Sequence, residues 1–196
     1  MKFIKNEYPY FDLSDKFKNL NSITTDKYKK TIFTLFLILF YSLCFGLGMM
    51  MFNYHSKFVS SAFYFLFFLI VSSIIIVPIH LLLHALALPG QYSNNDIYVG
   101  FNKSLLNFFV LYNKPMSKKR LIFSTLLPFI FITASTLGTL LFIYKNMFVY
   151  ALFCFNILLS VFDLYDAYIL IFKDKGEKDK SNRYIKVENS IYKTTI

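Results

Sequence analysis

Hydrophobic residues in this chain are gathered into four long blocks, which polar and charged segments separate. The blocks cover residues 31–52, 58–88, 121–144 and 147–172. Each block is long enough to cross the hydrocarbon core of a membrane, since about 20 helical residues span the ~30 Å of that core. The pattern predicts an all-α membrane protein with four transmembrane helices, whose membrane domain extends over residues 31–172.

The composition supports this class of protein. Hydrophobic residues make up 56% of the chain, with 25 Phe and 15 Tyr, and Trp is absent. A net charge of +10 in a soluble protein would raise the question of nucleic-acid binding. Here the charges flank the apolar blocks, so we expect the lipid bilayer as a partner and no nucleic acid. The abundance of Lys, Asn, Ile, Phe and Tyr indicates an AT-rich bacterial genome.

The basic residues predict how the spans are oriented. The N-terminal tail 1–30, the loop 89–120 and the C-terminal tail 173–196 together hold nineteen of the 21 Lys and Arg residues. The other two, Lys57 and Lys145, lie in the short connections between spans. Cytoplasmic loops carry such an excess of positive charge. We therefore expect a multi-pass protein of the cell membrane with both termini in the cytoplasm.

The segments outside the spans carry weaker patterns. In the loop 89–120, residues 97–101 and 108–112 are two short β-prone runs, which predict a β-hairpin. An interfacial amphipathic helix is the alternative for this loop. The C-terminal tail 173–196 mixes charges of both signs, and we expect it to be solvated.

Two histidines near the end of the second block are the first candidates for chemistry. His80 and His84 are four residues apart, which places both rings on one face of a helix, one turn apart. This is the ligand half of the zinc motif H-E-x-x-H, in which the glutamate acts as general base. Leu81 occupies the glutamate position here. Pro78 can bend the helix just before the pair.

Two carboxylates in the fourth block lie at a matching depth. At ~1.5 Å per residue, the histidines are about 6–12 Å, and Asp163 and Asp166 about 9–14 Å, below the same membrane surface. Two neutral imidazoles and one carboxylate form a standard zinc set with a fourth position open. Helix packing by a single histidine, or an ion pair of Asp166 with Lys173 at the interface, are the plainer alternatives.

Two further polar residues share a helix stripe with Asp163. Asn156 and Ser160 precede it by seven and three residues. They are candidates for hydrogen bonds to the metal ligands or to a substrate. Packing between helices is the equally weighted alternative.

Three patches of the chain resemble a known family. They are the segment 79–85 with its two histidines, the segment 114–120 followed by Pro128, and the segment 156–163 with its N…S-x-x-D pattern. In this order they resemble the bacterial integral-membrane family of putative zincin peptidases, which looks distantly like the intramembrane site-2 metalloproteases. The resemblance covers roughly residues 60–175.

The resemblance implies one zinc ion bound by His80, His84 and Asp163, and a membrane peptide or protein as substrate. Leu81 departs from the pattern, because its side chain cannot take a proton from a metal-bound water, and general-base catalysis contributes about 10²–10⁴-fold. Three hypotheses follow. The leading one is a metal-binding pseudopeptidase with weak or absent proteolysis. The others are an active metalloendopeptidase with Asp166 as a displaced base, and a non-enzymatic transporter, proton relay or immunity-type membrane protein.

Overall fold

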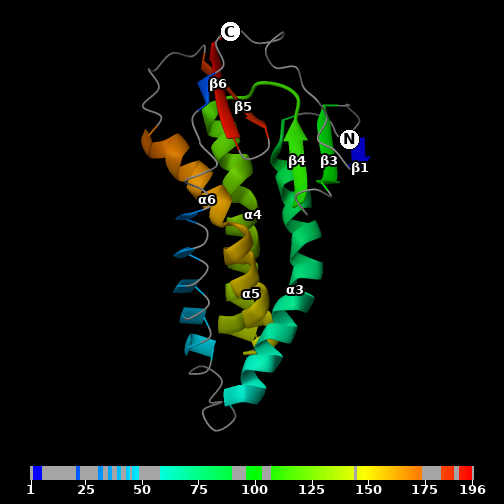
Figure 1. Ribbon diagram of the computed structural model, residues 1–196, viewed down its shortest axis with the longest axis vertical. Coiled ribbons are helices and arrows are strands. Elements are labelled where there is room, and N and C mark those ends of the chain that lie inside the picture. The colour runs from blue at the N-terminus through cyan, green and yellow to red at the C-terminus, as the bar shows by residue number, and fades with distance from the viewer. Residues whose placement is uncertain are drawn as a thin grey trace. The chain divides into compact units, whose positions relative to one another are not determined.

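The structure is a computed structural model, and helices make up most of its described part (Figure 1). The described residues are 2–5, 21–22, 31–32, 35–36, 39–40, 43–44, 46–48, 58–89, 96–102, 107–143, 145–173, 182–187 and 190–195.

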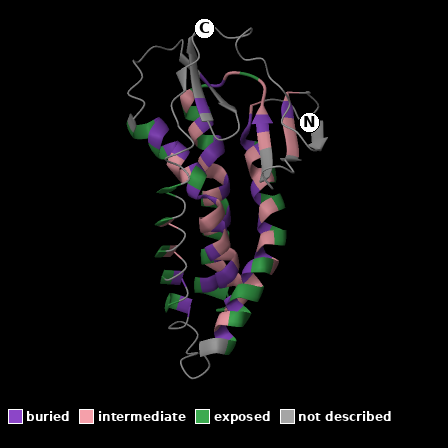
Figure 2. Cartoon of the chain, in the orientation of Figure 1, coloured by how far each residue is buried: buried purple, intermediate pink, exposed green. Residues whose placement is uncertain are grey.

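Two helices are long and apolar enough to cross a membrane. Helix α3 covers Phe58–Ala87, and helix α4 covers Lys118–Gly138 and continues as the π-helix η2 over Thr139–Ile143. The parts of these helices that are long and apolar enough for a membrane span are Ser60–Ala87, with 28 residues, and Lys118–Ile143, with 26 residues. Figure 2 shows exposed turns along α3, where Ile74 is 71% exposed. A helix with so much exposed apolar surface suits a lipid environment, so the structure supports membrane association.

A bent pair of helices follows. Helix α5 covers Met147–Leu159, and helix α6 covers Val161–Tyr168 and continues as the π-helix η3 over Ile169–Lys173. Asn146 caps the amino end of α5, because its side-chain Oδ1 accepts a hydrogen bond from the Phe148 amide at 2.7 Å. The two helices are bent by 43° and count as a third span if they cross as one.

The first predicted span, 31–52, is described only in part. Most of its positions, like most of the tail 1–30, lie outside the described residues. The number of four spans therefore stays a prediction, whereas the described residues contain two helices long and apolar enough to cross a membrane, and one bent pair.

The predicted hairpin in the loop 89–120 is confirmed. Strand β3, Ile97–Asn102, pairs antiparallel with strand β4, Asn107–Tyr112. The alternative of an interfacial helix is wrong, because the β-branched and aromatic residues of the two runs favour extended backbone. Strand β1, Lys2–Lys5, adds in parallel to β3. At the base of the hairpin, Lys114 Nζ donates to Asp96 Oδ2 at 2.7 Å, and this bond, with the attraction between the charges, raises the pKa of Lys114.

A second hairpin lies in the segment that was expected to be a solvated tail. Strands β5, Asn182–Val187, and β6, Ser190–Thr195, pair antiparallel, and strand β2, Asn21–Ser22, pairs with β6. Tyr184 and Ile191 are buried, 2% and 0% exposed. The backbone of Tyr184 also exchanges two hydrogen bonds with that of Met116, both 2.9 Å. The expectation of a merely solvated segment is therefore wrong for these strands.

The chain divides into two compact units, each with its own apolar core. The first unit comprises Met1–Lys27, Leu81–Leu127 and Asp163–Ile196, and the second comprises Tyr28–His80 and Pro128–Phe162. The core of the first unit contains Ala85, Leu88, Ile97, Met116, Leu121, Leu170, Tyr184 and Ile191. That of the second contains Cys44, Phe65, Leu69, Leu140, Met147, Tyr150, Ala151 and Cys154. Within the second core, Tyr150 Oη donates a hydrogen bond to the Cys44 carbonyl at 2.9 Å, which links these two buried residues.

Candidate metal centre

Helix α3 presents the two histidines on one face, as their spacing predicts. The helix runs unbroken to Ala87, so His84 follows His80 by a little more than one turn. His80 is 4% exposed, and the His84 side chain is 18% exposed. Both rings are therefore largely shielded from solvent, and polar rings in such a place need polar partners.

Asp163 comes from the first turn of α6, directly after the break between α5 and α6. Ser160 ends α5, and its amide donates to the Asn156 carbonyl at 3.0 Å. The new helix starts at Val161, which places the buried Asp163 at its amino end. Amide groups and the helix dipole there favour a negative charge. The break therefore places the Asp163 side chain at the amino end of a helix, where a negative charge is favoured.

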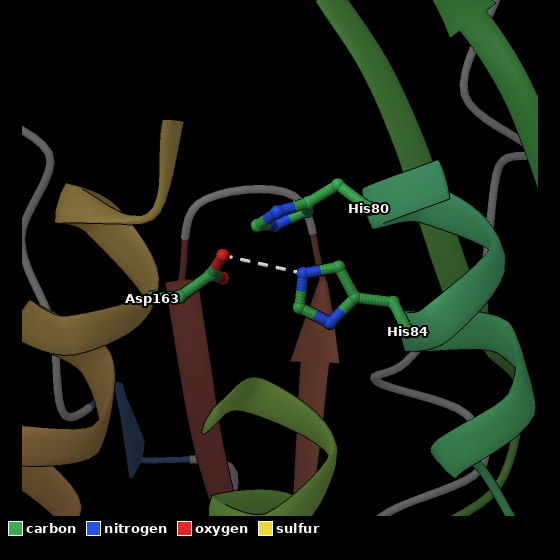
Figure 3. Close-up of side chains that lie close together, drawn as sticks. All are labelled: His80, His84 and Asp163. Atoms are coloured by element: carbon green, nitrogen blue, oxygen red, sulfur yellow. Dashed lines mark hydrogen bonds and ion pairs between the residues drawn. The ribbon is translucent and has the colours of Figure 1, made fainter. Parts of the chain in front are cut away.

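The structure brings together the three residues that the sequence analysis proposed as ligands (Figure 3). His84 Nε2 lies 3.2 Å from Asp163 Oδ2. One ligand atom from each of His80, His84 and Asp163 lies within 4.8 Å of the others. The histidines and the aspartate that the sequence analysis paired by their expected depth thus form one cluster of side chains.

A backbone carbonyl fixes the orientation of the His84 ring. His84 Nδ1 lies 2.8 Å from the Ser124 carbonyl oxygen. A carbonyl oxygen only accepts, so Nδ1 carries the proton and donates it. In the neutral ring, Nε2 then carries a lone pair, and it faces the Asp163 carboxylate at 3.2 Å. Two electron-rich atoms at this separation are stabilised by a cation between them.

The donor set and its dimensions fit zinc. Zinc in proteins takes imidazole nitrogen and carboxylate oxygen at about 2.0–2.2 Å, in tetrahedral geometry. Two such ligands are then about 3.3 Å apart, close to the 3.2 Å between His84 Nε2 and Asp163 Oδ2. Three protein ligands leave the fourth position open, which is the arrangement of catalytic sites. The hydrogen bond that His84 Nδ1 donates to the Ser124 carbonyl is the outer contact that zinc-bound histidines commonly make.

The other predicted site residues lie close by in the chain but differ in their observed contacts. Asp166 is 1% exposed and follows Asp163 on α6, but it is not a member of the three-residue group. Asn156 donates from Nδ2 to Thr133 Oγ1 at 3.0 Å and to the Phe129 carbonyl at 3.5 Å, which joins α5 to α4. These bonds give Asn156 a packing role; its contact with a ligand or substrate stays a prediction.

Two buried oxygens near the α5–α6 break lack a hydrogen-bond partner within the described part of the chain. They are Ser160 Oγ and Asn156 Oδ1. Both residues are 0% exposed. Buried polar atoms are normally paired, so these two are suited to hydrogen bonds with a bound polar group. This observation is compatible with the role in substrate or ligand binding that the sequence analysis gave them.

Sequence analysis did not find Ser124. Its contribution to the site is a main-chain carbonyl, which every residue type carries, so residue identity gives no signal there. The only indirect signal is the proline four residues later, Pro128, which the sequence analysis used as part of a family pattern.

These features define a membrane-associated helical protein with a buried His-His-Asp cluster suited to a metal ion. The model of the family described as "Putative zincin peptidase" matches residues 73–177. This match covers more than half of the chain and includes all three clustered residues, and the protein belongs to that family. No curated protein and no solved structure matches the chain.

Proposed function

We propose that this protein is a multi-pass membrane protein that holds one zinc ion with His80, His84 and Asp163, and that it has weak or absent peptidase activity. The observation that carries the proposal is the convergence of three ligand atoms within 4.8 Å. The membership of a zincin family supports zinc as the metal. A zinc ion in this set would supply a Lewis acid and lower the pKa of a bound water toward ~7.

Leu81 is the reason for proposing weak catalysis. It follows the first histidine directly, where H-E-x-x-H proteins carry the glutamate that accepts a proton from the metal-bound water. A half-buried leucine side chain has no group that can accept it. The three glutamates of the chain, Glu7, Glu177 and Glu188, all lie outside the predicted spans. The proposed role is therefore metal-dependent binding of a membrane peptide or protein rather than its rapid hydrolysis.

A buried carboxylate favours one competing function. Asp166 lies one turn after Asp163 on α6 and is 1% exposed. In an active metalloprotease it would replace the missing glutamate as general base. The two functions differ in a simple assay, because chelator-sensitive cleavage of a membrane peptide that is lost in Asp166→Asn supports the protease.

Metal analysis tests the proposal directly. The protein is purified in detergent, loaded with zinc, passed through a desalting column and analysed by mass spectrometry of its metal content. We expect about one zinc per chain in the wild type and a loss of most of it in His84→Ala and Asp163→Ala. His55→Ala is the matched control, since it removes the one histidine outside the set and should keep the metal. A wild-type protein that retains no zinc would overturn the proposal.

A further inference from the structure

A buried proline lies inside α4, one turn after the carbonyl that contacts His84. Pro128 is among the fully buried side chains, and the helix continues on both sides of it, from Lys118 to Gly138. Proline has no N–H, so the carbonyl four residues earlier loses its regular helical donor. In α4 that carbonyl belongs to Ser124.

The carbonyl that lacks its helical donor is the one that accepts a hydrogen bond from the His84 ring. The Ser124 carbonyl accepts the hydrogen bond from His84 Nδ1 at 2.8 Å. The two hydroxyls on the same turn do not compete for it. Ser124 Oγ and Thr125 Oγ1 donate to the Leu121 carbonyl instead, at 2.9 Å and 2.8 Å. The imidazole therefore takes the place of the missing amide.

We propose that Pro128 is a positioning residue for the metal centre. By leaving the Ser124 carbonyl without its helical donor, it holds His84 in the Nδ1–H tautomer and directs Nε2 toward Asp163. The part of this inference that concerns zinc rests on the proposed function, whereas the part that concerns the tautomer of His84 stands without it. Pro128 is not one of the three clustered residues, so its proposed effect passes through the helix backbone.

The second proline within a long helix shows that the effect is specific to Pro128. Pro78 lies inside α3 and leaves the carbonyl of Ile74 without its helical donor in the same way. The Ile74 side chain is 71% exposed, so this turn of α3 lies at the surface of the protein. Of the two prolines inside the described long helices, Pro128 alone frees a carbonyl to which one of the clustered histidines donates a hydrogen bond.

The test compares two replacements of Pro128 that differ in a single N–H. Pro128→Ala restores an amide that donates to the Ser124 carbonyl. Lactic acid introduced at position 128 by nonsense suppression has the same side chain but an ester oxygen in place of the N–H. Alanine is a stronger helix former than proline, so Pro128→Ala does not lose helix propensity, whereas the lactic-acid residue lacks the backbone donor as proline does. The ring and its steric effect on the helix are absent from both.

Two readouts are measured for each variant. One is the tautomer of His84, from ¹⁵N chemical shifts of histidine-labelled, metal-free protein, in which three histidines give a spectrum simple enough to assign. The other is zinc affinity by competition with a chelator. We expect Pro128→Ala to shift His84 toward the Nε2–H tautomer and to weaken zinc binding about 10–100-fold, as loss of outer hydrogen bonds does. The lactic-acid variant should resemble the wild type in both.

The outcomes separate this inference from the proposed function. An unchanged tautomer in Pro128→Ala, or equal behaviour of the alanine and lactic-acid variants, would overturn the positioning role. If the wild type binds no zinc but the tautomer still follows the N–H at position 128, the proposed function fails and the positioning of His84 stands.

Discussion

Leu81 stands where H-E-x-x-H proteins carry their general base, next to the histidines proposed as metal ligands. Leu81 lies between the two histidines in sequence and is half-buried on α3. The proposed ligands converge, with His84 Nε2 3.2 Å from Asp163 Oδ2. If the proposed zinc binding is correct, the side chain at position 81 controls whether a metal-bound water can be activated. This can be tested by replacing Leu81 with glutamate.

We predict that Leu81→Glu creates or strongly increases peptidase activity. General-base catalysis is typically worth about 10²–10⁴-fold, so the increase should be of that order. The measurement is cleavage of a fluorogenic membrane-peptide library by zinc-loaded protein in detergent. The matched control is Leu82→Glu, which adds the same charge one residue later at a position that is 54% exposed. Adding His84→Ala to Leu81→Glu should abolish the gain.

Two results would contradict this prediction. A zinc-loaded Leu81→Glu protein no more active than Leu82→Glu would show that the cluster does not support hydrolysis. A wild type that already cleaves as fast as Leu81→Glu would show that another base, with Asp166 as the candidate, already acts in the natural chain.

At the scale of residues, the sequence predicted the members of the cluster but not all its contacts. The helical spacing of His80 and His84 fixed their common face, and the depth argument paired them with α6. Depth could not rank Asp163 above Asp166, because one helical turn changes depth by only about 5 Å. The structure places Asp163 in the three-residue group. The contact with Ser124 involves a carbonyl and has no side-chain signature.

At the scale of elements, the two hairpins show why one was predicted and the other was not. The β3 and β4 runs are almost free of charge, so their extended pattern is visible in the sequence. In β5 and β6, lysines lie among the apolar residues: Lys186 pairs with Ile191, and Lys193 pairs with Tyr184. Tyr184 and Ile191 are diagonal neighbours on one face, and both are buried. The mixed charge of the whole segment hid this face.

We predict that Ile191→Ala destabilises the protein substantially. Ile191 is 0% exposed and belongs to the core of the first unit, and removing such a side chain costs about 2–5 kcal/mol. The measurement is thermal or denaturant unfolding in detergent. Ile74→Ala is the matched control, because the same deletion at a 71% exposed position removes few contacts and should change stability by less than about 0.5 kcal/mol. Equal effects of the two variants would show that the β5–β6 hairpin does not contribute to a stable core.

At the scale of the whole molecule, the family match and the apolar helices agree. The matched region, residues 73–177, begins within α3 and contains α4, α5, α6 and the β3–β4 hairpin. The sequence patches that resembled the family cover almost the same part of the chain. The count of spans was harder to obtain, because the first block lies largely outside the described residues and the fourth is a bent pair. Length and composition alone cannot show whether a bent helix pair crosses a membrane.

Whether the number of spans is even or odd decides if the two termini lie on the same side of the membrane, which gives the last prediction. Four spans place both termini on one side of the membrane, whereas three place them on opposite sides. Because nineteen of the 21 basic residues lie in the two tails and the loop 89–120, we expect both termini in the cytoplasm. With both native cysteines replaced by serine, single cysteines are introduced at positions 5, 118 and 178 and, for the short connections, at 57 and 145.

A membrane-impermeant thiol reagent applied to intact cells should label positions 57 and 145 and leave the other three unlabelled until the cells are lysed. Labelling of only one of the two tails in intact cells would mean an odd number of spans. In that case either the first block or the α5–α6 pair does not cross the membrane. If the α5–α6 pair were the one that enters without crossing, Asp163 would reach the histidines as part of a re-entrant segment, and the depth argument that matched it to the end of α3 would need a different geometry.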